Sequence, residues 1–132
     1  MVPSTVRDGL KTRLETISGL RAYDVIPDVP VAPCAIIGFL DMNFDSTFAR
    51  GMDEATVEID VLVQRMSSRA AQDKLDGLLA GSGSGSVKAA IEGDRTLGGA
   101  VQTLRVLSAT AGNYDAAGTS LLAYRYRITL WG

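Results

Sequence analysis

The chain has 132 residues, of which 46% are hydrophobic and 21% charged, and its net charge is −2. This balance predicts one globular domain and argues against a protein that holds nucleic acid on a basic surface. The chain has no histidine and only one cysteine, Cys34, which excludes Ser-His-Asp and Cys-His triads, an intrachain disulfide and a zinc site built on cysteines.

The N-terminal segment predicts a helix followed by a short strand. Apolar residues at spacings of four and three form one stripe over 4–18, namely Val6, Leu10, Leu14 and Ile17. We expect Ser4 to cap this helix and Gly19 to end it. A short strand is predicted over 20–26, and the prolines within 27–30 end it.

The middle of the chain predicts three more strands. The continuous apolar run 34–40 is typical of a buried central strand. Apolar and polar residues then alternate over 41–48 and again over 55–63, which predicts two strands with one face on the core. The short, glycine-bearing segment 49–53 predicts the hairpin connection between them.

A second helix is predicted over 67–80, where leucines recur at helical spacing. The Gly-Ser repeat of 81–86 is a flexible connector, and because the residues after it contain no complete domain, we expect it to join elements of one fold. A helix of one to two turns is predicted over 86–92 and ends at Gly93.

The last part of the chain predicts two strands, 101–109 and 121–131, joined by a long hairpin tip over 110–120. The predicted order is therefore α-β-β-β-β-α-α-β-β. We expect a single α+β domain over 1–132, with a mainly antiparallel sheet of about five to six strands and two main helices packed on it.

Several segments carry residue types that bind ligands, yet each favours a structural role. The run Asp41 to Asp45 begins like a calcium loop, but Ser46 and Met52 stand where that loop needs glycine and glutamate. The Gly-Ser repeat lacks the Gly-Lys-Ser/Thr ending of a phosphate loop. Cys34, in an apolar run, is expected to be a small core residue. We therefore expect no catalytic residue, metal or cofactor, and a protein that is not an enzyme.

Charged residues on two predicted strands leave two interpretations open. Glu58 and Asp60 share one strand face, and Arg125 and Arg127 share another. They either pair across neighbouring strands or line a surface that meets another subunit. Trp131 and Tyr114 are likewise either exposed anchors for a partner or packed on their own domain.

Several segments resemble one family of phage proteins. Residues 86–101 (SVKAAIEGDRTLGGAV) are similar to a stretch of the small tail terminator proteins of long-tailed bacteriophages, especially those that infect actinobacteria. Residues 47–54 (TFARGMDE), residues 17–24 (ISGLRAYD) and the polar tip leading to an aromatic last strand resemble the same family. The resemblance covers nearly the whole chain in order.

The resemblance implies a structural role in the virion. Tail terminators form a ring, usually a hexamer, on the last ring of tail-tube protein, stop polymerisation, and present a surface to the head-side connector or stopper protein. It implies a protein made in the host cytoplasm and located at the tail-neck region of the virion, with DNA passing through the ring without specific binding. No apolar run approaches the about 20 residues that span a bilayer, and we expect neither a membrane partner nor a signal peptide.

Assembly into a ring would require the 41–53 hairpin, the 110–120 tip or a sheet edge to meet neighbouring subunits. The two loops are the predicted subunit interfaces, since loops on a rigid scaffold commonly carry interactions. The candidate contact residues are Phe48, Arg50, Met52, Asp53, Asn113, Tyr114 and Asp115. Two alternatives remain: another neck or tail component, such as a head-tail joining or tube protein, and a small non-catalytic α+β binding domain.

Overall fold

The computed structural model describes residues 1–17, 19–25, 33–44, 52–63, 73, 76–81, 83, 85–116 and 119–132, with the backbone alone for 113–116 and 119–122. Within these residues the elements in chain order are α1 (Pro3–Leu14), β1 (Arg21–Tyr23), β2 (Cys34–Asn43), β3 (Glu54–Val63), α3 (Val87–Glu92), β4 (Thr103–Ala116) and β5 (Thr119–Trp131).

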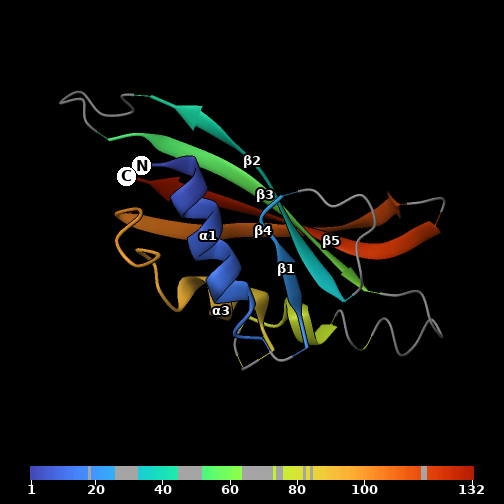
Figure 1. Cartoon of the computed structure of the whole chain (residues 1–132). Helices are drawn as coiled ribbons and strands as arrows, with labels where there is room; N and C mark the ends of the chain where they lie inside the picture. Colours follow the sequence, from blue (N-terminus) through green and yellow to red (C-terminus); the bar gives the residue numbers. More distant parts are fainter. Residues whose placement is uncertain are drawn as a thin grey trace.

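The five strands form one mixed sheet in the order β1-β2-β3-β5-β4. β1 runs parallel to β2, and the other three neighbouring pairs are antiparallel. The predicted α+β class is confirmed, and the sheet carries a parallel pairing at one edge. Figure 1 shows α1 lying across the sheet, with α3 close to its C-terminal half.

The main core lies between the helices and one face of the sheet, which we call the helix face. α1 places Val6, Leu10 and Leu14 on it, each with no exposed surface. The side chains buried with them include Ala35, Ile37, Val57, Ile59, Val61, Val87, Ile91, Leu104, Ile128 and Leu130. On the opposite face, which we call the far face, the described residues form a smaller buried apolar cluster of Cys34, Ile36, Leu62 and Ala123.

The predictions of separate strands over 34–40 and 41–48 were wrong, because one strand, β2, continues from Cys34 to Asn43. Its pairing with β3 shifts between Ile37 and Leu40. An extra residue at this bulge reverses which residues face the core, so a single strand carries two alternation patterns. Residues 45–48 lie outside the described residues.

The predicted hairpin tip over 110–120 was also wrong. β4 runs to Ala116 and β5 starts at Thr119, and their ladder continues up to the pair of Ala116 with Thr119. Residues 117–118 lie outside the described residues.

The helices differ from the predictions at their ends. α1 starts at Pro3, with Val2 at the N-cap position and no side-chain cap, so Ser4 does not cap it. Proline suits the first helical turn because it has no N–H to satisfy there and its φ is already helical. The predicted helix 86–92 is confirmed as Val87–Glu92, and Ser86 caps it by accepting a hydrogen bond from the Ala89 amide at 3.1 Å. Of the predicted helix 67–80, Asp73 and 76–79 are helical and Ala80 is not, while 67–72, 74 and 75 lie outside the described residues.

The turn after α3 is packed against a glycine of α1. Both carboxylate oxygens of Asp94 accept hydrogen bonds in this turn, from Thr96 and from the Gly98 amide. These bonds hold the pKa of the Asp94 carboxyl below its ordinary value. The turn presents Leu97, with φ of 50°, against Gly9, where an added Cβ would lie 2.9 Å from the Leu97 Cβ.

Gly9→Ala is therefore expected to destabilise the protein by about 1 kcal/mol. Alanine in a helix is ordinarily favoured over glycine by about 1 kcal/mol, but overpacking a filled site costs about 1–3 kcal/mol. Urea unfolding followed by circular dichroism measures the difference. In a Leu97→Gly background, which removes the opposing Cβ, the same substitution should become neutral or stabilising. A Gly9→Ala protein as stable as the natural chain would contradict the close contact.

Candidate assembly interface

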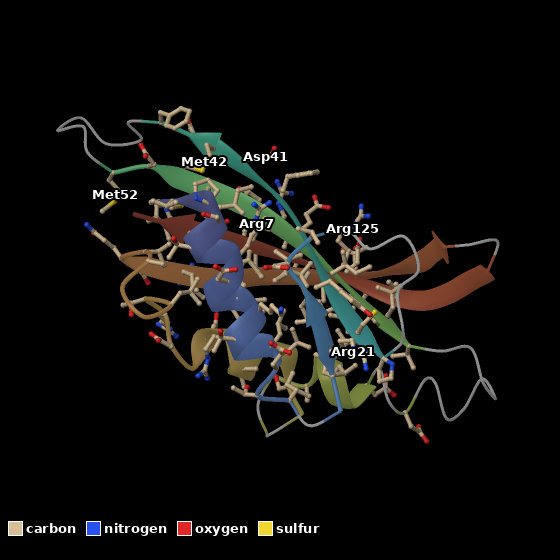
Figure 2. All side chains as sticks on the ribbon, in the orientation of Figure 1. Arg7, Arg21, Asp41, Met42, Met52 and Arg125 are labelled. Atoms are coloured by element: carbon tan, nitrogen blue, oxygen red, sulfur yellow. The ribbon has the colours of Figure 1, made fainter. Side chains whose placement is uncertain are left out.

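The first predicted interface segment, 41–53, begins in β2 and ends at Asp53, which pairs with Gly132. Asp53 donates its amide to the Gly132 carbonyl at 2.8 Å and accepts from the Gly132 amide at 3.0 Å. Met52 and Asp53 are half-buried at this position, and Figure 2 shows Met52 at the same end of the sheet as Met42. Phe48 and Arg50 lie outside the described residues.

The second predicted segment is part of a strand pair that projects from the sheet. Asn113, Tyr114 and Asp115 belong to β4 and pair with Leu122, Leu121 and Ser120 of β5. Pairing of β3 with β5 reaches only Val63 with Leu122. Beyond that level the described sheet consists of β4 and β5 alone, so this hairpin extends past its neighbours (Figure 1).

The structure does not bring the two predicted segments together. β2 ends and β3 begins at one end of the sheet, whereas β4 turns into β5 at the other end (Figure 1). A contact-making protein with this layout has two separate surfaces, one at each end of its strands.

Strand β2 has an open edge that the sequence did not reveal. β1 pairs with it over only three residues, ending at Ile36, and no described strand pairs with β2 beyond that point. Gly38 and Phe39 lie together opposite Glu58, which defines a bulge. A Cβ on Gly38 would lie 3.0 Å from the Glu58 carbonyl oxygen, so glycine fits this close approach. Phe39 is 74% exposed.

A cavity of about 270 Å³ lies beside this open edge. α1 contributes Arg7, the residues after β1 contribute Asp24 and Val25, and the bulge contributes Gly38 and Phe39. Val25 is 64% exposed, so this part of the edge shows two large apolar side chains to solvent. Exposed apolar groups along an unpaired strand are typical of a surface that meets another protein.

Strand β4 forms the opposite edge of the sheet, and one carboxylate caps part of it. Glu92, at the end of α3, accepts a hydrogen bond from the Val106 amide at 3.1 Å and pairs with Lys88. Burial opposes ionisation of Glu92, but these hydrogen bonds and the charges of Lys88 and Arg95 outweigh it. They hold the pKa of the Glu92 carboxyl below its ordinary value.

Past this capped point, β4 carries a bulge of its own. The pairing with β5 shifts between Val106 and Ser108, which leaves Leu107 as the extra residue, and its side chain is 50% exposed. Ser108 pairs with Arg127, and Arg127 pairs with Glu58, the residue opposite the β2 bulge. β2 and β4 are therefore bulged at the same level of the sheet.

The charged residues of the far face answer the question left open by the sequence. Arg125 donates to Asp60 at 2.9 Å and 3.5 Å and lies 3.2 Å from Glu58, so the cross-strand pairing is confirmed for Arg125. The Arg125 side chain is 59% exposed, and a pair this open contributes no more than about 1 kcal/mol. Its position on the sheet is labelled in Figure 2.

Three further exposed charges lie on the far face away from β1. Asp41 lies on β2, and Arg105 and Arg127 lie on β4 and β5. None of the three has an ion-pair partner within the part of the chain that the structure describes. Arg21 on β1 is also exposed and lies beside Cys34 on this face, so the β1–β2 side carries both signs of charge, whereas the two charges on the β4–β5 side are both basic.

Cys34 is buried on the far face, and burial raises the pKa of its thiol from 9.0 to about 11, although Arg21 acts in the opposite direction. The folded chain should therefore hold about a hundredfold less thiolate than the unfolded chain near neutral pH. A folded-state pKa above the unfolded value stabilises the fold below pH 9.0, and this stabilisation is lost as the pH rises toward about 11. The rate at which the Cys34 thiol reacts with a chromogenic disulfide, with and without denaturant, measures the difference in thiolate content. Equal rates in the two conditions would contradict the burial.

Among the described residues, no group of three or more histidine, cysteine or carboxylate side chains gathers in a way that could hold a metal ion. In the same part of the chain, no helix has the length and apolar character needed to cross a membrane.

Comparison with known proteins adds no relative. No protein-family model matches the chain, and no curated protein matches it either.

Proposed function

We propose that this chain is a tail terminator: a non-catalytic virion protein that caps the end of a phage tail tube and stops its polymerisation. In the same position it offers the joining surface to the head-side connector. The residues that support this are those of 86–101 and 47–54, which resemble the family. DNA passes through the ring without specific binding, and the protein acts at the tail-neck region of the virion.

One observation carries the proposal furthest: the β2–β3 connection and the β4–β5 hairpin lie at opposite ends of the sheet, and parts of β2 and β4 have no described strand beside them. A ring that caps a tube needs two axial surfaces, one toward the tube and one toward the connector. It also needs two lateral surfaces that match each other, because each subunit meets a neighbour on both sides. The β2–β3 end and the β4–β5 hairpin supply the axial pair, and the edges supply the lateral pair.

The test is a capping experiment with the tail-tube protein encoded in the same genome as this chain. Tube polymerisation is started with and without the purified chain, and tube length is measured by electron microscopy. We expect shorter tubes that carry the labelled chain at one end only, because a terminator binds the last ring. A genome without a tail-tube gene, or tubes of unchanged length without bound chain, would overturn the proposal.

The same experiment separates the alternatives. A chain that polymerises into tubes by itself is a tube protein, and one that binds only the connector is a joining protein. A chain that binds neither the tube nor the connector fits the small binding domain. Chain denatured beforehand serves as the control for nonspecific attachment to tube ends.

A further inference from the structure

The backbone groups that face the open edge of β2 follow from the hydrogen bonding of the sheet. Asp53 and Gly132 exchange both of their backbone hydrogen bonds. Residue pairs in an antiparallel ladder alternate between hydrogen-bonded and non-bonded. Val57 lies an even number of residues after Asp53 on the same strand, so it also directs its amide and carbonyl to β5. Leu40, opposite Val57, therefore points its own amide and carbonyl away from β3. Met42 does the same, and both residues reach the open edge.

The matching groups on β4 follow in the same way. The bond from the Val106 amide to Glu92 shows that β4 directs this amide away from β5. After the bulge at Leu107, alternation directs the backbone groups of Ala109 and Ala111 outward as well. No described strand pairs with this side of β4. The open part of β4 therefore begins just beyond the point that Glu92 caps.

We infer that the open edge of β2 in one copy pairs with the open edge of β4 in a second copy, with Asp41 opposite Thr110. This register places Leu40 opposite Ala111 and Met42 opposite Ala109, so all four residues with outward backbone groups are paired. β2 and β4 run in opposite directions within the sheet. A second copy can therefore keep the orientation of the first and be displaced sideways and along the strands. Its β4 then pairs antiparallel with β2 of the first copy, which is β-augmentation.

The side chains on each face suit this pairing. On the helix face, the small Ala109 and Ala111 leave room for the half-buried Leu40 and Met42 of the neighbour. On the far face, the open part of β2 carries Asp41, and the β4–β5 side of the next copy carries Arg105 and Arg127. The charges nearest the proposed contact are thus of opposite sign.

The pairing joins two different edges, so it is a head-to-tail contact, and it forms a closed ring when the rotation between neighbouring copies completes a full turn. The displacement along the strands is the stagger that a closed sheet requires. As the lateral contact of the terminator ring, this inference rests on the proposed function, while the pairing itself is measurable in the chain alone.

The experiment introduces two exposed cysteines, Asp41→Cys and Thr110→Cys, into a chain whose native thiol is removed by Cys34→Ala. The directly opposed cysteines should form disulfides between copies under mild oxidation. We expect a ladder of covalent oligomers on a non-reducing gel, and its collapse by reductant. Each single-cysteine variant can form nothing larger than a dimer. The matched control, Asp41→Cys with Thr103→Cys, keeps the same strand and face but moves the second cysteine behind the capped point, and should give no ladder.

The oxidation is carried out on the chain alone and on the chain bound to tube ends in the capping experiment. A ladder in either sample supports the pairing, and a ladder in the chain alone does so even if capping fails. Capped tubes with no ladder would overturn the edge pairing and leave the terminator function standing. An absence of both capping and ladder would overturn both, and a ladder from the Thr103 control alone would place the contact elsewhere on β4.

Discussion

Replacing Leu10 by alanine is expected to lower the free energy of unfolding by about 3–5 kcal/mol, the range for a leucine removed from a packed core. Leu10 has no exposed surface and lies in the main cluster between α1 and the sheet. The truncation leaves a cavity between α1 and the sheet. Water in this apolar cavity would lose hydrogen bonds, so filling it with solvent would not restore the lost stability. Urea unfolding, followed by circular dichroism, measures the change in midpoint.

Leu107→Ala is the matched control for this prediction. It removes the same atoms from a leucine that is 50% exposed on the β4 bulge, so we expect a loss below about 1 kcal/mol. If the two substitutions cost the same, the helix face of the sheet would not be the main source of stability.

Removing the Glu92 carboxylate should have the second largest effect. Glu92→Ala leaves the amide of the buried Val106 without its acceptor, which costs about 1–3 kcal/mol. Glu92→Gln keeps an acceptor oxygen but loses the charge that pairs with Lys88, so a smaller loss is expected. Both values come from urea unfolding at neutral pH.

We also expect the stability contributed by Glu92 to depend on pH. Its pKa is lower in the folded chain than its ordinary value of 4.5. The ionised group therefore stabilises the fold above about pH 4.5, and this stabilisation disappears as the pH falls through the lowered folded-state pKa. Unfolding curves of the natural chain and Glu92→Gln should converge in acid. A stability difference that stays constant down to low pH would contradict the assignment.

Regular patterns allowed parts of this fold to be predicted from the sequence. The alternation over 55–63 identified β3, and the short apolar repeat over 86–92 identified α3, because each element buries one continuous face. The stretch 34–48 was misread because the bulge at Gly38 and Phe39 shifts the alternation by one residue. A sequence pattern shows such a shift only as two apparent strands.

Other features had no pattern to reveal them. The segment 110–116 has many small and polar residues, and it is strand because its backbone pairs with β5, not because its side chains need burial. The bond from Val106 to Glu92 joins a side chain to a backbone amide 14 residues away. Phe39 stands in an apolar run that predicts burial, and Leu107 follows Val106 in a predicted strand; the exposure of both side chains depends on the bulges in β2 and β4.

The alignment of the two bulges has a mechanical consequence. The row from Phe39 through Glu58 and Arg127 to Leu107 crosses four strands of the sheet, with an extra residue at each end. A bulge bends its strand and increases the local twist. We therefore expect β2 and β4 to bend at the same level of the sheet, so that this row governs the direction of the β2–β3 end relative to the β4–β5 end of the subunit.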